Sequence, residues 1–144
     1  MLTGVVQKAG MVMGHTIKLA ALGAVAFMVL DGVWLGVLMK NFYRDQLAPI
    51  VRLADGGIAP NWPAALVVYA LLGTGIAVFV VPRASTASLA AVYGALFGLV
   101  VYGVYDFTNY STLRQWPFVL TLADVAWGAV ASAACAVAVR IVAR

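Results

Sequence analysis

The chain has 144 residues, of which 65% are hydrophobic and only 10% are charged, and its mean hydropathy is +1.01. A soluble domain has about 45–50% apolar and about 25% charged residues, so this composition excludes a soluble globular enzyme, a disordered segment and a nucleic-acid-binding module. The net charge of +4 comes from nine Lys and Arg against five Asp, which in so apolar a chain is typical of residues at membrane edges. The single cysteine, Cys135, excludes a disulfide framework.

Four stretches are apolar enough, and at about 20 residues long enough, to cross a bilayer as helices. Asn61 is placed to cap the second, with Pro63 in its first turn, and Ser85 to cap the third. Residues 82–84 predict a tight turn, which makes spans two and three an antiparallel hairpin. The sequence therefore predicts an all-α integral membrane four-helix bundle, a single domain over 1–144 with a longer loop between the first two spans. The spans are expected at about 17–39, 62–81, 85–106 and 117–139.

Both chain ends lie on one side of the membrane if the number of spans is even. Residues 1–12 add no recognisable element, and Met13 is an alternative start. The apolar run after Lys18 is too long for a signal peptide and has no small-residue cleavage site. The positive-inside rule leans toward cytoplasmic termini by one residue, and that margin disappears if Met13 is the start. The termini side carries Lys8, Lys18, Arg83, Arg140 and Arg144, against Lys40, Arg44, Arg52 and Arg114 on the other.

Residues 40–61 form the one long connection. Apolar residues such as Phe42 and Leu47 alternate with charged ones such as Arg44 and Asp45, so part of the segment can lie as a short interfacial helix. The simpler interpretation is a linker that rests on the lipid headgroups.

Three of the five acids fall inside the predicted spans. Asp31 lies about 12 Å below the loop edge of span one, and Asp124 about 10 Å into span four, at the helical rise per residue. Asp106 lies at the end of span three. Because of the direction of the spans, all three belong to the leaflet beneath the 40–61 and 107–116 loops. A charge at mid-bilayer costs at least about 2.5–3.5 kcal/mol, so these acids are the candidate site.

Two of the acids share a local pattern with tryptophan. Asp31 and Trp34, and likewise Asp124 and Trp127, stand at i, i+3 on one helix face. In antiparallel helices Trp34 comes to the depth of Asp124 and Trp127 to the depth of Asp31. Since an indole donates and a carboxylate accepts, we expect spans one and four to be neighbours, joined by Asp31–Trp127 and Asp124–Trp34 hydrogen bonds.

Span three adds a polar stripe. Tyr102, Asp106 and Asn109 stand at i, i+4 and i+7, with Tyr105 beside them. Asp106 can alternatively pair with an interfacial base, Arg114 or Arg44, and the acid of span one can simply be held by indole and tyrosine donors. Three carboxylates could hold a hard cation, but no ligand spacing specifies a metal, and no cofactor motif occurs. The sequence predicts neither a metal nor a cofactor.

Two pairs of glycines stand four residues apart. Gly32 and Gly36 lie in span one, and Gly94 and Gly98 in span three. This spacing is typical of positions where membrane helices approach closely, so we expect both pairs to lie at helix contacts.

Two groups of residues carry a resemblance to a known family. Leu30-Asp-Gly-Val-Trp-Leu-Gly36, with Phe42-Tyr-Arg44 and Leu47, resembles the first signature of the domain-of-unknown-function 2177 family of small bacterial integral membrane proteins. The second signature is similar to Tyr105-Asp-Phe-Thr-Asn109, Thr112-Leu, Trp116-Pro117 and Asp124-Val-Ala-Trp-Gly128. The resemblance covers the chain from about residue 13 and implies a multi-pass protein of the bacterial inner membrane, a family without an agreed activity.

The leading hypothesis is a protein that binds or transports a proton, a cation or a lipid headgroup through its intramembrane aspartates. An enzyme acting on a lipid or isoprenoid is an alternative, disfavoured because no nucleophile or cofactor motif occurs; an accessory or scaffold subunit is another. The expected partner is the lipid bilayer and not nucleic acid, and a homo-oligomer is left open. The candidate ligand- or proton-binding residues are Asp31, Trp34, Tyr43, Arg44, Tyr102, Tyr105, Asp106, Asn109, Asp124 and Trp127.

Overall fold

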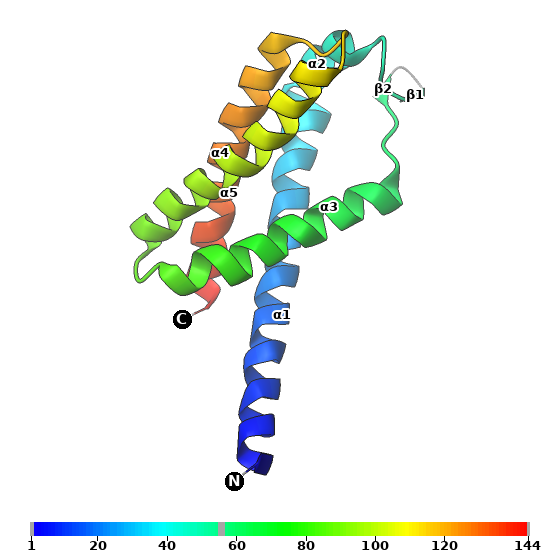
Figure 1. Cartoon of the computed structure of the whole chain (residues 1–144). Helices are drawn as coiled ribbons and strands as arrows, with labels where there is room; N and C mark the ends of the chain where they lie inside the picture. The colour runs from blue at the N-terminus through cyan, green and yellow to red at the C-terminus, as the bar shows by residue number, and fades with distance from the viewer. Residues whose placement is uncertain (1, 55–56, 144) are drawn as a thin grey trace.

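The computed structural model describes residues 2–54 and 57–143, without the side chains of Leu2 and Thr3; the loop acid Asp55 lies outside the described residues. The molecule is a bundle of long helices with a short helix and a two-stranded hairpin between the first two spans (Figure 1). The elements are α1 (Leu2–Val33), α2 (Lys40–Leu47), β1 (Leu53–Ala54), β2 (Gly57–Ile58), α3 (Trp62–Gly75), α4 (Ala87–Thr112) and α5 (Phe118–Val142).

Four helical segments are long and apolar enough to cross a membrane. Their outer faces carry large apolar side chains that the protein itself leaves exposed, such as Leu71 on α3 and Val104 on α4. In water such a surface would be unfavourable, whereas lipid tails cover it without loss. The predicted all-α membrane bundle is confirmed. The segments are Gly4–Leu38, Trp62–Arg83, Ala87–Thr112 and Phe118–Val142.

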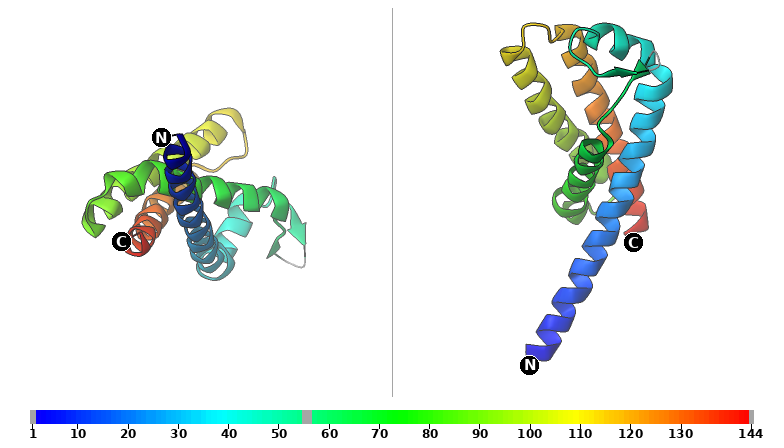
Figure 2. Two further views of the ribbon diagram at one scale, coloured as in Figure 1. Left: turned by 90° about the horizontal axis from the view of Figure 1, so that it is seen from below. Right: turned by 90° about the vertical axis from the view of Figure 1, so that its right-hand side faces the viewer.

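Two helices continue beyond the predicted spans, and one predicted cap is wrong. Helix α1 begins at Leu2, not near residue 17, and its first turns extend beyond the other helices (Figure 2). Helix α4 continues to Thr112 instead of ending near Asp106, and its last hydroxyl groups bond back to the Thr108 carbonyl. Thr86, not Ser85, caps α4: its hydroxyl accepts from the Leu89 amide at 3.1 Å.

The predicted cap of the second span is confirmed. The Asn61 side chain accepts from the Ala64 amide at 3.3 Å, and Pro63 lies in the first turn of α3. After the turn at 81–86, α3 and α4 diverge, and α4 meets the second span mainly at the segment Ile76–Val80 (Figure 1). The two spans therefore form a hairpin that is open at its loop-side end.

Small residues set the two closest helix crossings. A Cβ on Gly94 would lie 2.6 Å from the Ser132 carbonyl oxygen, so α4 and α5 approach to a distance that only glycine permits. A Cβ on Gly23 would lie 3.0 Å from the Gly73 Cα, where α1 crosses α3. The prediction for Gly94 and Gly98 is confirmed. The prediction for Gly32 and Gly36 is wrong for this chain, since nothing among the described residues lies within 4 Å of a Cβ at either position.

The 40–61 connection is more ordered than a linker. Its first half is α2, which lies across the loop-side end of the bundle and buries Tyr43, and its second half contains the antiparallel β1–β2 pair (Figure 1). The interpretation as a plain linker is wrong for residues 40–47, and the short-helix alternative is correct there.

A π-helical segment, Trp34–Leu38, links α1 to α2. Its wider turn is closed by the Met39 amide, which donates to the Trp34 carbonyl at 2.8 Å. At Met39 the backbone leaves the helical conformation, with φ −116° and ψ 13°, and the chain turns into α2. Single π turns of this kind recur at functional sites because they re-aim side chains; here the segment begins at a candidate residue.

Candidate functional site

The first contact at the loop-side end of the bundle joins α1 to α5. The Trp127 indole donates to an Asp31 carboxylate oxygen at 2.8 Å, and Asp31 is only 8% exposed. The phenol of Tyr69, on α3, also faces Asp31. The predicted Asp31–Trp127 hydrogen bond and the predicted contact between spans one and four are both confirmed.

The two tryptophans of the repeated pattern also touch one another. The Trp34 and Trp127 rings stack with centroids 4.3 Å apart and planes 2° from parallel. Stacked aromatic pairs contribute about 0.5–1.5 kcal/mol beyond the area they bury. This stack holds the end of α1 to α5 at the depth of the two acids.

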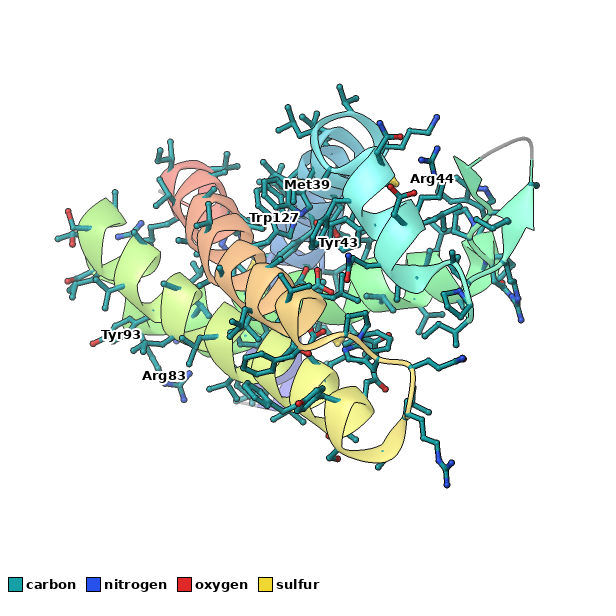
Figure 3. The ribbon with its side chains drawn as sticks, turned by 90° about the horizontal axis from the view of Figure 1, so that it is seen from above. Met39, Tyr43, Arg44, Arg83, Tyr93 and Trp127 are labelled. Atoms are coloured by element: carbon teal, nitrogen blue, oxygen red, sulfur yellow. The ribbon has the colours of Figure 1, made fainter. Side chains whose placement is uncertain are left out.

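The second predicted hydrogen bond, between Asp124 and Trp34, is wrong, because the two residues are linked through a third. The Trp34 indole donates at 3.0 Å to the hydroxyl of Tyr43, and that hydroxyl donates to Asp124. The phenol lies between the two residues because α2 folds back over the bundle end. Figure 3 shows Tyr43 pointing toward the side on which Trp127 lies, while Arg44 points away.

Tyr43 is a fixed hydrogen-bond donor. Burial, followed by its hydrogen bond to Asp124, raises the pKa of the Tyr43 phenol above its usual range. The hydroxyl therefore stays protonated at neutral pH and can hold the Asp124 carboxylate with its proton while accepting from the indole. Tyr43 was a predicted site residue, but its position between an acid and an indole was not predicted.

Asp106 is placed differently from the other two acids. It is 0% exposed, it lies opposite Asp124, and neither of its carboxylate oxygens has a hydrogen-bond partner at normal geometry among the described residues. The Trp116 indole lies nearby but donates to the Thr121 hydroxyl at 3.2 Å. A buried carboxylate without a donor is rare in folded proteins, which makes Asp106 the most unusual group of the site.

The alternative pairing of Asp106 with Arg44 or Arg114 does not occur among the described residues. Arg44 instead forms an ion pair with its neighbour Asp45, at 2.8 Å, on the exposed side of α2. Arg114 is an exposed residue of the linker between α4 and α5. Both guanidinium groups stay in the solvent layer above the bundle because α4 carries Asp106 inward, toward α5.

Tyr102 lies at the centre of the acids. Its half-buried phenol is close enough to Asp31, Asp106 and Asp124 to interact electrostatically with all three. The ring lies directly against Gly128 of α5, where a Cβ would collide with it. The glycine after Trp127 therefore makes room for the phenol.

Tyr105 and Asn109 lie at the margin. Tyr105 is 58% exposed and packs edge-on against Trp116, with ring centroids 5.8 Å apart. Asn109 is half-buried one turn further along α4, beside that phenol. The structure thus brings seven of the ten candidate residues together and leaves Arg44, Tyr105 and Asn109 outside. We call these seven residues the acid–aromatic cluster: Asp31, Trp34, Tyr43, Tyr102, Asp106, Asp124 and Trp127.

Two polar residues near the cluster were not predicted. Tyr69 is the only tyrosine of the second span, and a lone phenol in an apolar stretch was a usable signal. Thr121, fully buried, accepts from Trp116, and nothing in the local sequence distinguishes it. In the described part of the chain, no group of three or more His, Cys, Asp or Glu side chains is arranged to hold a metal ion.

Comparison with known proteins gives one match. No curated protein and no solved structure is significantly similar to the chain. The model of one family, described as "Predicted membrane protein (DUF2177)", matches residues 16–141. This region includes the second and third spans whole, most of the first and nearly all of the fourth, and every residue of the acid–aromatic cluster. The chain therefore belongs to this family of predicted membrane proteins of unknown function.

Proposed function

We propose that the chain binds a proton between Asp106 and Asp124 and uses this site in a binding or transport process at the loop-side leaflet. The observation that carries the proposal is the buried Asp106 carboxylate, which lies opposite Asp124 with no donor to either oxygen among the described residues. Two facing carboxylates repel each other, and a shared proton removes the repulsion and supplies the missing hydrogen bond.

The surroundings support a proton more than a larger cation. Divalent cations take six or more oxygen ligands, whereas the described residues offer no group of three or more acidic or metal-ligating side chains with suitable geometry. Phosphate-bearing headgroups would be repelled by the acids. Tyr43 supports the same proposal, because its hydroxyl donates to Asp124 and leaves the second face of that carboxylate toward Asp106.

The contacts of Asp31 support a structural role for this acid within the same cluster. Its carboxylate has a donor from α5, Trp127, at 2.8 Å, so its charge is compensated without a ligand. We therefore divide the acids: Asp31 holds α1 to α5, and the other two exchange the proton. The alternative in which the acids only hold helices together then applies to Asp31 alone.

Infrared difference spectroscopy of the purified protein between acidic and alkaline pH tests proton binding directly. We expect a protonated-carboxyl band that is lost in Asp106→Asn and in Asp124→Asn. Asp45→Asn is the matched control, since Asp45 is exposed and paired with Arg44, and its spectrum should keep the band. A wild-type band that persists in Asp106→Asn would refute the proposal.

Flux measurements separate transport from binding. Proteoliposomes that contain a pH-sensitive dye should show proton entry with the wild-type chain and none with Asp106→Asn. Binding without flux would keep the site but assign it to a sensing or accessory role. Replacing the pH gradient with a sodium gradient tests the competing cation, which we expect to have no effect.

We also propose a bacterial cell-membrane location with cytoplasmic termini. The support is the excess of Lys and Arg on the termini side. A reporter that is active only in the cytoplasm should be active when it is fused to the C-terminus. If a reporter that is active only in the periplasm were active there instead, the proposed orientation would be wrong.

A further inference from the structure

A second polar site lies at the opposite end of the bundle from the acids. A groove of about 520 Å³ opens between α1, the turn at 81–86 and the end of α5. In Figure 1 and in the view from below in Figure 2, the end of α5 lies between that turn and α1. Three basic side chains from three different elements line the groove: His15, Arg83 and Arg140.

Among the residues that the structure describes, neither guanidinium group of the groove bonds to a carboxylate. Arg140 donates to the Ala84 and Ser85 carbonyls, at 2.6 and 2.9 Å, and Arg83 donates to the Phe79 carbonyl at 2.9 Å. Each guanidinium has five N–H donors, so both retain donors for another acceptor. No Asp or Glu occurs in residues 1–30, 62–105 or 125–144, and the positive charge of this end is therefore uncompensated by side chains.

The groove lies at the level of the membrane surface. Arg83 is the last residue of the span Trp62–Arg83, and Arg140 lies in the last turn of the span that ends at Val142. Basic side chains at this depth meet the phosphates of lipid headgroups. Apart from Thr16 and Ser85, the remaining wall is apolar and includes Leu19 and Val81, which suits the glycerol and acyl part of a lipid and does not suit a free ion.

We propose that this groove binds the phosphate of an anionic phospholipid. Arg83 and Arg140 hold the phosphate oxygens with charge-assisted hydrogen bonds, His15 borders the headgroup, and the apolar wall takes the start of an acyl chain. The bound lipid would join α1 to the α3–α4 turn and to α5 at an end of the bundle that has no acidic residue. The proposal is independent of the proton site, which lies at the other membrane face.

Native mass spectrometry of the full chain in detergent tests the proposal. The protein is offered equal amounts of phosphatidylglycerol and phosphatidylcholine, and the retained lipid is counted. We expect preferential retention of phosphatidylglycerol and a loss of about fivefold in Arg83→Gln, the usual effect of one basic residue at an anionic surface. Arg83 is exposed, so the variant should fold; His15→Gln gives a second variant, and Arg83→Lys should restore most of the retention.

Two control variants distinguish a site from general attraction. Lys8→Gln removes a charge on the same side but outside the groove, and Arg114→Gln removes one from the opposite face. Both should retain phosphatidylglycerol like the wild type. Equal retention of the two lipids, an equal loss in Lys8→Gln and Arg83→Gln, or displacement of the lipid by inorganic phosphate would each overturn the proposal.

Discussion

The segments that begin at Asp31 and at Asp124 have the same Asp-x-x-Trp pattern but different environments. Asp31 accepts directly from the indole of the other segment, Trp127. Asp124 is reached by Trp34 only through the Tyr43 hydroxyl. The difference arises because α2 follows the first segment and covers its end, whereas α5 continues straight past the second. The same local pattern therefore gives one acid that accepts directly from an indole and one acid that accepts from a phenol.

The glycines of the two segments differ in the same way. Gly128, directly after Trp127, lies under the Tyr102 ring, whereas Gly32 has no neighbour within 4 Å among the described residues. One segment lies at the centre of the bundle, and the other presents its glycine face outward. Four substitutions measure these differences.

Gly128→Leu should have the largest effect. The new side chain collides with Tyr102, and overpacking of this kind destabilises by about 3 kcal/mol. Thermal unfolding in detergent, followed by circular dichroism, should show a large fall in Tm. Gly32→Leu is the matched control and should leave Tm nearly unchanged; an equal fall in both variants would show that the two segments are packed alike.

Trp127→Phe should have the next largest effect. The ring keeps most of the stack with Trp34, but buried Asp31 loses its indole donor and keeps only the Tyr69 phenol beside it; a lost hydrogen bond to a buried charged group costs about 2–3 kcal/mol. Equilibrium unfolding in a mixed-detergent titration measures the change. Trp62→Phe, at the exposed start of α3, should change little, and a loss as large as that of Trp127→Phe would argue against the role of the hydrogen bond.

Tyr43→Phe should cost about 1–2 kcal/mol, because Asp124 is only half-buried and loses a donor that water can partly replace. The effect should depend on pH. The pKa of Tyr43 is raised above the ordinary 10.0 in the folded chain, so its stabilisation is complete below pH 10 and declines above it, where the unfolded phenol ionises. The gap between wild type and variant should therefore narrow above pH 10; a constant gap would contradict this.

Trp34→Phe should have the smallest effect, about 0.5–1 kcal/mol. The Tyr43 hydroxyl loses the indole but still donates to Asp124, so no buried acid is left without a donor. The double variant with Tyr43→Phe should then be less destabilised than the two single variants added together. Strict additivity in the same unfolding titration would show that the three residues do not act as one chain of hydrogen bonds.

The sequence alone was sufficient for the Asp31–Trp127 contact. Its prediction used only helix rise, span direction and the pairing of an indole donor with a carboxylate, and these hold for any antiparallel pair of membrane helices. Asp124 and Trp34 are not directly bonded because Tyr43, from a segment whose sequence favours a loop, lies between them. The turn at Met39, which sends α2 back over the bundle, has no Pro or Gly within two residues, and Gly36 lies within the preceding π-helical segment.

Asp106 shows the same limit. Its place at the loop-side end of the third span was predictable, but two arginines in nearby connections were the natural partners on sequence grounds. The helix continues to Thr112, so Asp106 lies inside α4 and faces α5, while Arg44 is already paired with Asp45. The rotation of α4 about its own axis, which turns Asp106 toward α5, depends on the close approach of Gly94 and Gly98 to α5. That approach is a property of the packed bundle.

Composition and spacing thus determined that the chain is a four-span α-helical membrane protein, and they predicted three acids toward one end of the bundle, because the bilayer constrains length, hydropathy and charge along a single axis. Rotation of each helix about that axis and the path of the connections are not constrained by the bilayer. They are decided by contacts between helices: glycines that admit a neighbour, an indole stack, and a tyrosine carried in by α2. Tertiary structure alone therefore decided that Asp124 is held by the Tyr43 phenol and that Asp106 is left to face Asp124.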